Sequence, residues 1–220
     1  TTISMTGTAN LFTNNTMHKT GTSATIRIGD APKVFFNEIY DTAYLQSDGT
    51  IIQMMQGEQQ GAEIAYNWVH DSPKYGIRMD GPFGGTNSGR NASVHHNVLW
   101  NANGAIVAKG DYHSVTNNTV LLGSEDDRNH IIVLYDSTGG NENSTIMSNV
   151  ADSISGHRTN SNESNPIPEN NTTIGNNWNG YDAQNANESV AGMLVSPEMN
   201  DFRPVFGSEI DLMGAGAYSS

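Results

Sequence analysis

The sequence predicts a single all-β domain built as a solenoid of roughly six coils. The 220 residues include 27 Asn, 20 Ser, 19 Thr and 23 Gly, a composition that disfavours helices and suits short strands joined by tight turns. One asparagine recurs along the chain at intervals that fit single coils. Short apolar segments lie between its copies, so each interval holds two strands.

The recurring asparagine sits at the centre of similar segments such as FFNEIYDT, AYNWVHDS and HHNVLWNA. Successive copies are 22, 30, 30, 21 and 31 residues apart. At a bend between strands, an Asn amide can donate a hydrogen bond to one neighbouring coil and accept one from the other, and Asn tolerates left-handed backbone. We therefore expect a buried ladder of amides formed by Asn15, Asn37, Asn67, Asn97, Asn118 and Asn149.

The apolar segments between these asparagines predict a second strand in each coil. They are ATIRIG, TIIQMM, YGIRMDG, GAIVAKG and HIIVLY. Apolar and polar residues alternate in Ile26-Arg27-Ile28. One face of such a strand is expected to point into the core and the other to solvent.

The regular pattern ends near residue 157. We divide the domain into coils over residues 1–157 and an irregular, Asn-rich wrap with a C-terminal cap over residues 158–220. Trp178 and Tyr181 are expected to hold the wrap, and an apolar group near the end is expected to close the C-terminal end of the core. This group is Phe202, Val205, Phe206, Ile210 and Leu212. The lack of a comparable cap before Ile3 predicts either a further N-terminal segment or end-to-end contact with a neighbouring molecule.

Charge and composition exclude several partners. The formal net charge of −13 argues against nucleic acid and anionic membrane surfaces, because phosphate groups would be repelled. No stretch approaches the roughly 18 to 20 apolar residues that span a bilayer, so no membrane insertion is expected. Without cysteine the chain has no disulfide, no thiolate metal site and no cysteine nucleophile.

Asn-x-Ser/Thr sequons indicate an extracellular or cell-surface glycoprotein. The chain contains eight, whereas its Asn, Ser and Thr content predicts roughly five by chance. We expect N-linked glycans at several of them. They begin at Asn14, Asn91, Asn117, Asn143, Asn162, Asn170, Asn171 and Asn187.

Several segments resemble the right-handed parallel β-helix proteins of the pectate-lyase-like superfamily. They are the asparagine-centred repeats, YGIRMDG, GDYHSVTNNTV and the ending DFRPVFGSEIDLMGAGAY. The resemblance covers residues 3–157 and 201–218, and it implies that the coils wind right-handed. Polysaccharide lyases, glycoside hydrolases, epimerases, viral tailspikes and non-catalytic surface proteins all belong to this superfamily, so the resemblance does not select an activity.

Neighbouring coils of a solenoid lie about 4.8 Å apart, so residues at matching positions form one surface cluster. Aligning IRIGD, IRMDG and VAKGD places Arg27, Arg78 and Lys109 on one flank, with Gln53 in the coil between. The same alignment adds Asp30, Asp80, Asp111, Tyr112 and His113. This flank is predicted to bind polysaccharide, with Arg27 and Gln53 among the contacts.

Cleavage of a uronate polymer by β-elimination is the most specific hypothesis for the flank. The reaction needs a cation at the substrate carboxylate, a base for the α-proton and a proton donor for the leaving oxygen. We assign Arg78 as the carboxylate clamp, Lys109 or His113 as the base and Tyr112 as the donor. No catalytic signature of the superfamily matches these residues one by one.

A glycoside hydrolase would instead use two carboxylates, for which Asp80 and Asp111 are the natural pair. An Asp at a strand end more often forms an Asx turn, so each residue taken alone favours a structural role. The long loop over residues 81–93 adjoins the flank, and its Phe83 offers an apolar face to a sugar ring. Trp68 and Trp100 are either sugar platforms or packing residues, and we favour packing.

No cofactor is required by these mechanisms, and no metal site is assigned. Calcium is the ion that the chain suits best, because acidic loops supply oxygen ligands, but no loop has the spaced D-x-D-x-D-G pattern and solvated acidic loops are the favoured interpretation. These loops lie around Glu58, Glu63, Glu125–Asp127 and Asp136. The adjacent pair His95 and His96 is not expected to bind a metal, because neighbouring residues of a strand point to opposite faces.

Two functions of different classes remain open. The first is an extracellular β-helix that binds polysaccharide and, in its most specific form, cleaves acidic polysaccharide. The alternative is a non-catalytic, glycosylated structural module of a fibre or cell-surface assembly.

Overall fold

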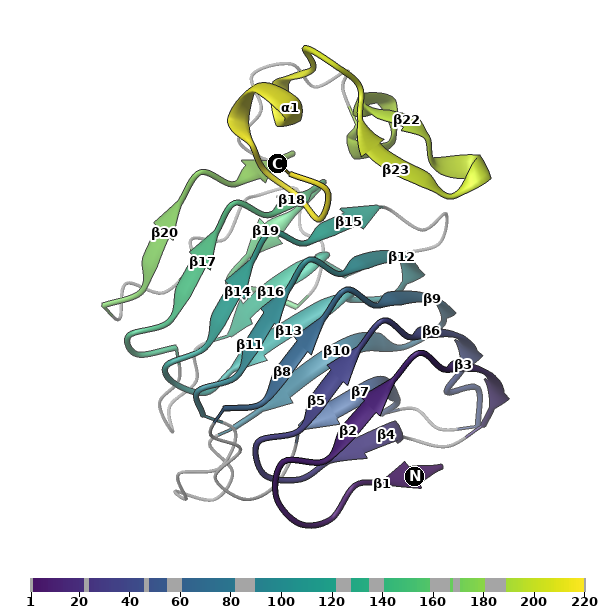
Figure 1. Ribbon diagram of the computed structural model, residues 1–220. Helices are drawn as coiled ribbons and strands as arrows, with labels where there is room; N and C mark the ends of the chain where they lie inside the picture. The colour runs from purple at the N-terminus through teal and green to yellow at the C-terminus, as the bar shows by residue number, and fades with distance from the viewer. Residues whose placement is uncertain are drawn as a thin grey trace.

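The described residues of the computed structural model form three parallel sheets of seven strands each, which confirms the predicted all-β solenoid (Figure 1). Each coil adds one strand to every sheet in turn, and the coils wind right-handed along the axis. The structure describes residues 2–21, 24–45, 48–54, 61–81, 90–121, 128–134, 141–158, 167, 171–180 and 189–219.

We number the sheets in the order in which each coil enters them. Sheet 1 contains β1 (Ile3–Ser4), β4 (Ala24–Ile28), β7 (Thr50–Met54), β10 (Tyr75–Asp80), β13 (Ile106–Lys109), β16 (Ile131–Leu134) and β19 (Ile154–Ser155). Sheet 2 contains β2 (Leu11–Thr13), β5 (Lys33–Phe35), β8 (Glu63–Ala65), β11 (Ser93–His95), β14 (Ser114–Thr116), β17 (Thr145–Met147) and β20 (Thr173–Gly175). Sheet 3 contains β3 (Thr16–Thr20), β6 (Glu38–Thr42), β9 (Trp68–Ser72), β12 (Val98–Ala102), β15 (Thr119–Leu121), β18 (Val150–Ala151) and β21 (Trp178–Asn179).

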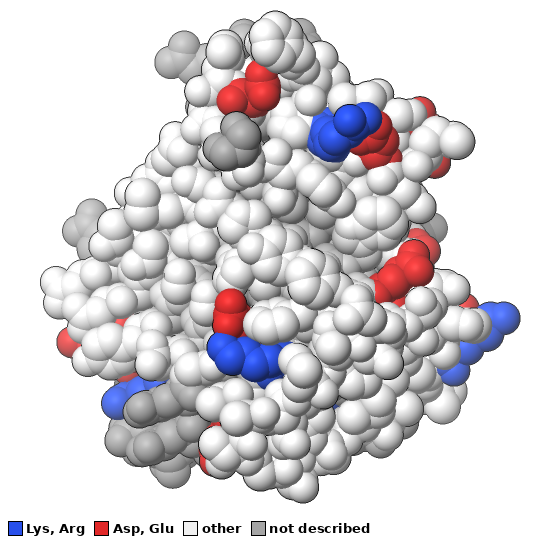
Figure 2. All heavy atoms as spheres, viewed as in Figure 1, with Lys and Arg blue, Asp and Glu red and all other residues white. Residues whose placement is uncertain are grey.

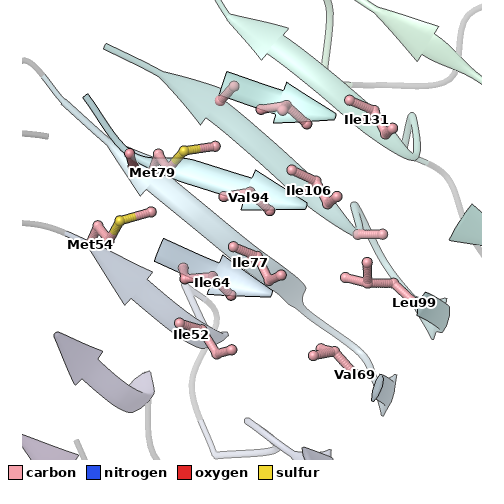
Figure 3. Packing of buried hydrophobic residues seen from close by; sticks show 14 of the residues in the cluster. Ile52, Met54, Ile64, Val69, Ile77, Met79, Val94, Leu99, Ile106 and Ile131 are labelled. Atoms are coloured by element: carbon pink, nitrogen blue, oxygen red, sulfur yellow. The ribbon is translucent and has the colours of Figure 1, made fainter. Parts of the chain in front are cut away.

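Stacked aliphatic side chains fill the interior of the solenoid. Parallel pairing without a shift in register places one isoleucine of each coil directly above the isoleucine of the previous coil. This column of sheet 1 consists of Ile26, Ile52, Ile77, Ile106 and Ile131, all fully buried. Residues of the other two sheets face it in Figure 3, among them Ile64, Val94, Val69 and Leu99.

The predicted asparagine ladder runs along the bend between sheets 2 and 3. Asn67 is fully buried, and its Nδ2 donates to Asn97 Oδ1 at 2.9 Å and to the carbonyl of Val34 at 2.9 Å. Its Oδ1 accepts from the backbone N–H and the Nδ2 of Asn37, at 3.0 and 2.9 Å. The ladder continues one coil further than expected, because Asn149 Nδ2 donates to Asn177 Oδ1 at 3.1 Å.

Each regular coil turns its corners with left-handed backbone at fixed distances from the ladder asparagine. One corner precedes that asparagine directly, and its residues have positive φ: Asn14, Phe36, Tyr66, His96, Asn117, Ser148 and Asn176. A second corner lies six residues before it, at Ala9, Ala31, Gly61, Asn91, Tyr112, Asn143 and Asn171. A third corner lies four residues after it, at Lys19, Asp41, Asp71 and Asn101. Asn and Asp are frequent at these corners because they tolerate left-handed backbone.

The coils continue beyond residue 157, where the sequence was expected to form an irregular wrap. β20 and β21 extend sheets 2 and 3 into this stretch, and Trp178 is buried as part of β21. Tyr181 lies outside the described residues.

Residues 190–219 form a C-terminal strap that packs on the outer face of sheet 3 (Figure 1). Phe202 of the strap is buried and contacts Trp68 and Trp100, with ring centroids 5.5 and 4.8 Å apart, which confirms packing roles for both tryptophans. The strap comprises η1 (Val190–Met193), β22 (Leu194–Ser196), η2 (Pro197–Met199), β23 (Asp201–Pro204) and α1 (Glu209–Met213). No helix in the described ranges has the length and apolar character to cross a membrane.

The strap corrects the prediction for the residues near the C-terminus. Phe202 and Ile210 are buried as expected, but they lie against sheet 3. Val205, Phe206 and Leu212 are 41%, 97% and 79% exposed, so the prediction that they close the core is wrong. The strap has only one face toward the solenoid, and these three side chains lie on the other.

Candidate functional site

The outer face of sheet 1 brings together most of the cationic flank predicted from the sequence. Arg27, Gln53 and Arg78 occupy the same register position in three successive coils. Lys109 was predicted to share this position, but it lies two residues away from it. Val107 pairs with Arg78, and Lys109 pairs with Asp80. Lys109 therefore lies one coil further along and nearer the end of its strand.

Arg78 is nearly buried and bridges two carboxylates. Its Nη1 lies 2.5 Å from Asp48 Oδ1 and its Nη2 lies 2.8 Å from Asp80 Oδ2. The arginine side chain is 8% exposed and that of Asp80 is 10% exposed, whereas Asp48 is 75% exposed. Both ends of the Arg78 guanidinium are thus engaged by the protein, and Asp80 is held as a partner of that cation.

Three guanidinium groups surround the ring of Tyr75, an arrangement that the sequence pattern did not predict. The guanidinium carbons of Arg128, Arg78 and Arg158 lie 4.5, 5.3 and 5.9 Å from the ring centroid. Arg158 Nη1 also donates to the Tyr75 hydroxyl at 2.9 Å. Arg128 precedes β16 and Arg158 follows β19, so strands several coils apart bring them together. We call these four residues the Tyr75 cluster.

The Tyr75 cluster packs on a small, mostly buried apolar group of the same face. Tyr75 is 4% exposed and packs with Val107 and Ile132, and Leu134 lies partly exposed against them. Of the ten basic residues of the chain, three lie on strands of this face and two more belong to the Tyr75 cluster. They are Arg27, Arg78, Lys109, Arg128 and Arg158. A strongly acidic protein thus has half of its cations on one side of one sheet.

The other predicted catalytic residues form the corner after β13, where they hold the backbone. His113 is 1% exposed; its Nδ1 lies 3.2 Å from the Ala92 nitrogen and its Nε2 lies 3.3 Å from the Lys109 carbonyl oxygen. Asp111 Oδ1 accepts from the backbone N–H of Glu142 at 3.0 Å. These contacts give His113 and Asp111 structural roles, as an Asx-type corner residue would have.

Tyr112 is the one residue of this corner with a largely accessible side chain. It is 46% exposed and has positive φ at a regular corner of the coil. The guanidinium of Arg90 lies 5.9 Å from its ring, and Arg90 Nη2 lies 3.5 Å from Asp111 Oδ2. Tyr112 therefore belongs to a surface cluster with Arg90, at the edge of sheet 2.

The remaining predicted ligand positions are only partly described. Phe83, Glu58, Glu125–Asp127 and Asp136 lie outside the described residues. Glu63 is described, and its two carboxylate oxygens contact Lys33 and His95. No group of three or more His, Asp or Glu residues in the described ranges is arranged to hold a metal ion.

The sequons of the described ranges coincide with the corners of the coils. Asn91, Asn143 and Asn171 are exposed and share one corner column, while Asn14 and Asn117 belong to another. In each case the Ser or Thr two residues later begins or enters a strand, where β-branched and hydroxyl residues fit well. The excess of sequons over chance therefore has a structural cause. Asn162, Asn170 and Asn187 lie outside the described residues.

Sheet 2 presents a face with few charged side chains, as the sparse red and blue spheres of Figure 2 show. At its border with sheet 3, Phe36, Tyr66 and His96 form a stack with ring centroids 5.1 Å apart at each step. Phe36 is 56% and Tyr66 45% exposed. Because the rings stack on one another, they offer edges more than broad faces to a ligand.

Lys33, Glu63, His95 and His96 form a polar row beside this stack. Two groups of this row have shifted pKa values. The hydrogen bond from Lys33 lowers the pKa of Glu63, and His95 adds to the effect. Burial, with a smaller contribution from the neighbouring His95, lowers the pKa of His96. At neutral pH the row therefore contains a charged carboxylate next to a neutral His96 imidazole.

Comparisons of the chain with protein-family models, with curated proteins and with solved structures gave no match. The fold is established by the strand pairing itself, and a β-solenoid hosts many unrelated functions. The chemistry of the Tyr75 cluster and its surroundings is therefore the feature that bears on function.

Proposed function

We propose that the protein binds acidic polysaccharide on the outer face of sheet 1. The observation that supports this function is the Tyr75 cluster, in which three guanidinium groups surround one buried aromatic ring, with the partly exposed Leu134 packed nearby. Arginine presents a planar fork of donors that matches a carboxylate, and an apolar side chain such as that of Leu134 suits the C–H face of a sugar ring. A uronate has both features.

Arg158 is the member of the cluster best placed to meet a ligand. It is partly exposed, and it forms no ion pair with a carboxylate of the described residues. Its hydrogen bond to the Tyr75 hydroxyl uses one of five N–H donors, which leaves others to bind a carboxylate. Arg78 has a structural role in the cluster instead, because its guanidinium is already paired with Asp48 and Asp80.

The net charge of −13 does not oppose binding at this face as strongly as the number suggests. At physiological ionic strength charges are screened over about 8 Å, so the local group of arginines dominates the potential that a bound sugar experiences. Oligosaccharides that fit the cluster are therefore expected to bind more readily than very long polyanions, which also approach the acidic surface.

Binding without cleavage is the function that the corner residues favour. His113 has both ring nitrogens directed at backbone atoms, and Asp111 caps a backbone N–H. Neither contact leaves the side chain oriented toward the Tyr75 cluster as a base or an acid. β-Elimination thus enters the test as an outcome to be measured.

The test is calorimetric titration of the protein with galacturonate and mannuronate oligosaccharides, with neutral maltooligosaccharides as the ligand control. Arg158→Ala is expected to weaken uronate binding about tenfold or more, because a charge-assisted hydrogen bond contributes about 1.5–3 kcal/mol. Arg203→Ala is the matched control, since it removes the same charge from the strap, where Arg203 is 67% exposed and paired with Asp201.

Equal affinities of the two variants, or equal binding of neutral and acidic sugars, would refute the proposal. In that case the glycosylated structural module is the better hypothesis. Ultraviolet absorbance of the same mixtures reports an unsaturated product, and its appearance would show that the face also carries out elimination.

A further inference from the structure

The corner between sheets 2 and 3 brings two adjacent histidine rings face to edge. His95 ends β11 and His96 follows it with a φ of 53°. An extended strand would direct the two side chains to opposite faces, which is the reason the sequence argued against a metal site here. The left-handed bend at His96 removes that reason, because the rings come to lie 5.1 Å apart with their Nδ1 atoms separated by 2.9 Å.

The tautomer of His95 is set by a carboxylate. His95 Nε2 lies 3.1 Å from Glu63 Oε1, and a carboxylate accepts, so Nε2 carries the proton. The Nδ1 lone pair of His95 then points toward His96. Lys33 pairs with the other oxygen of Glu63 and keeps it charged. A carboxylate that orients an imidazole through its distal nitrogen is the usual support of a metal-binding histidine.

The separation of the two nitrogens is closer to one coordination geometry than to another. Two metal–nitrogen bonds of about 2.0 Å place their nitrogens about 2.8–2.9 Å apart at a right angle and about 3.3 Å apart at a tetrahedral angle. The Nδ1 atoms are 2.9 Å apart, a separation set in the metal-free protein by the hydrogen bond between them, and it needs little change to reach the right angle of a tetragonal site. Tetragonal coordination by nitrogen and oxygen is typical of Cu²⁺, which also binds imidazole more tightly than other divalent metals of its row.

We propose that Nδ1 of His95 and Nδ1 of His96 form a two-nitrogen binding site for Cu²⁺, with Glu63 orienting His95. On binding, the proton that His96 shares with His95 moves to His96 Nε2, so both rings stay neutral and no other group has to ionise. Two protein ligands leave the other tetragonal positions to water or to an oxygen of a bound ligand. The site is partly open, since the His95 side chain is 17% exposed.

This site is independent of the proposed polysaccharide binding. It lies at the border of sheets 2 and 3, whereas the Tyr75 cluster lies on sheet 1. The failure of either proposal leaves the other intact.

The test is titration of the metal-free, full-length protein with CuSO₄, followed by calorimetry and electron paramagnetic resonance. We expect one tightly bound Cu²⁺ with a tetragonal spectrum and superhyperfine splitting from two nitrogens. His95→Ala and His96→Ala should each abolish this spectrum, while His157→Ala, which removes an exposed histidine elsewhere, should retain it. Glu63→Gln should weaken binding about 10- to 100-fold without removing the nitrogen ligands.

A wild-type spectrum with oxygen ligands alone would overturn the proposal, because it would show binding to surface carboxylates. An unchanged two-nitrogen spectrum in His95→Ala or His96→Ala would also overturn it. Circular dichroism identifies any variant that fails to fold. For such a variant, the nitrogen ligands in the wild-type electron paramagnetic resonance spectrum are the remaining test of the site.

Discussion

Removing one amide from the middle of the asparagine ladder should destabilise the fold far more than removing one from its first coil. Asn67→Ala deletes an Oδ1 that accepts two hydrogen bonds from Asn37 and an Nδ2 that donates to Asn97. Asn67 and Asn37 are 0% and 2% exposed, so water cannot replace these contacts. The substitution leaves two donors of Asn37 without an acceptor: its backbone N–H and one N–H of its Nδ2, whose other N–H still donates to the Phe12 carbonyl.

The expected loss follows from the two donors left behind. A buried polar group without a partner costs about 1–3 kcal/mol, so the two donors of Asn37 predict a loss of about 4 kcal/mol. This is a large part of the roughly 5–15 kcal/mol by which domains are stable. Asn15 is exposed and donates to Asn37 Oδ1 and to the carbonyl of Thr13. Asn15→Ala leaves no buried donor unpaired and should cost about 1 kcal/mol.

Equilibrium unfolding in urea measures the difference. Far-ultraviolet circular dichroism follows the strands and tryptophan fluorescence follows the strap, so divergence of the two signals would reveal unfolding in parts, which solenoids allow. Asn67→Ala should lower the free energy of unfolding several-fold more than Asn15→Ala. Equal losses for the two variants would show that the ladder amides do not carry the stability assigned to them.

Three further outcomes follow from single residues. Burial lowers the pKa of His130 to about 4, below the unfolded value of about 6.5, so stability should fall by about 3 kcal/mol as the pH drops from about 6.5 towards 4. Urea midpoints across this window should change more for the wild type than for His130→Asn, and parallel curves would contradict the argument. Gly216→Ala should loosen the strap and expose it to limited proteolysis, because φ is +95° and the added Cβ would lie 2.8 Å from Thr119 Oγ1; resistance equal to the wild type would count against this. Protein secreted from eukaryotic cells should carry a glycan at the exposed Asn91 and none at Asn117, whose amide donates to the strap; a glycopeptide that contains Asn117 would disprove the second part.

The ladder and the core columns could be predicted because both repeat with the coil. Asn37, Asn67 and Asn97 stand at the same bend, and the strand pattern of Ile26 and Ile77 recurs at each turn. The positions of the left-handed corners were not predicted, because Asn and Asp occupy some of them and residues of other chemical types occupy the rest. They are unified by backbone geometry, which permits Asn in one coil and a bulky aromatic ring in the next.

The candidate site was predictable only where it follows strand register. Arg27 and Arg78 were aligned correctly, whereas Lys109 is offset by two residues because the register of β13 pairs Val107, and not Lys109, with Arg78. Arg128 and Arg158 lie beyond the ends of their strands, so no periodic signal marks them. The approach of His95 to His96 likewise depends on one backbone angle that the sequence does not display.

The asparagine ladder has a direction. In every described step the Nδ2 of one coil donates to the Oδ1 of the following coil, so the amide dipoles add from head to tail. One end of the row presents an oxygen and the other an NH₂ group, as Asn15 and Asn177 do. A second solenoid can prolong the row only by joining unlike ends, since like ends would oppose acceptor to acceptor or donor to donor. A row prolonged in this way would be polar and open, so it would build a filament and not a two-fold dimer.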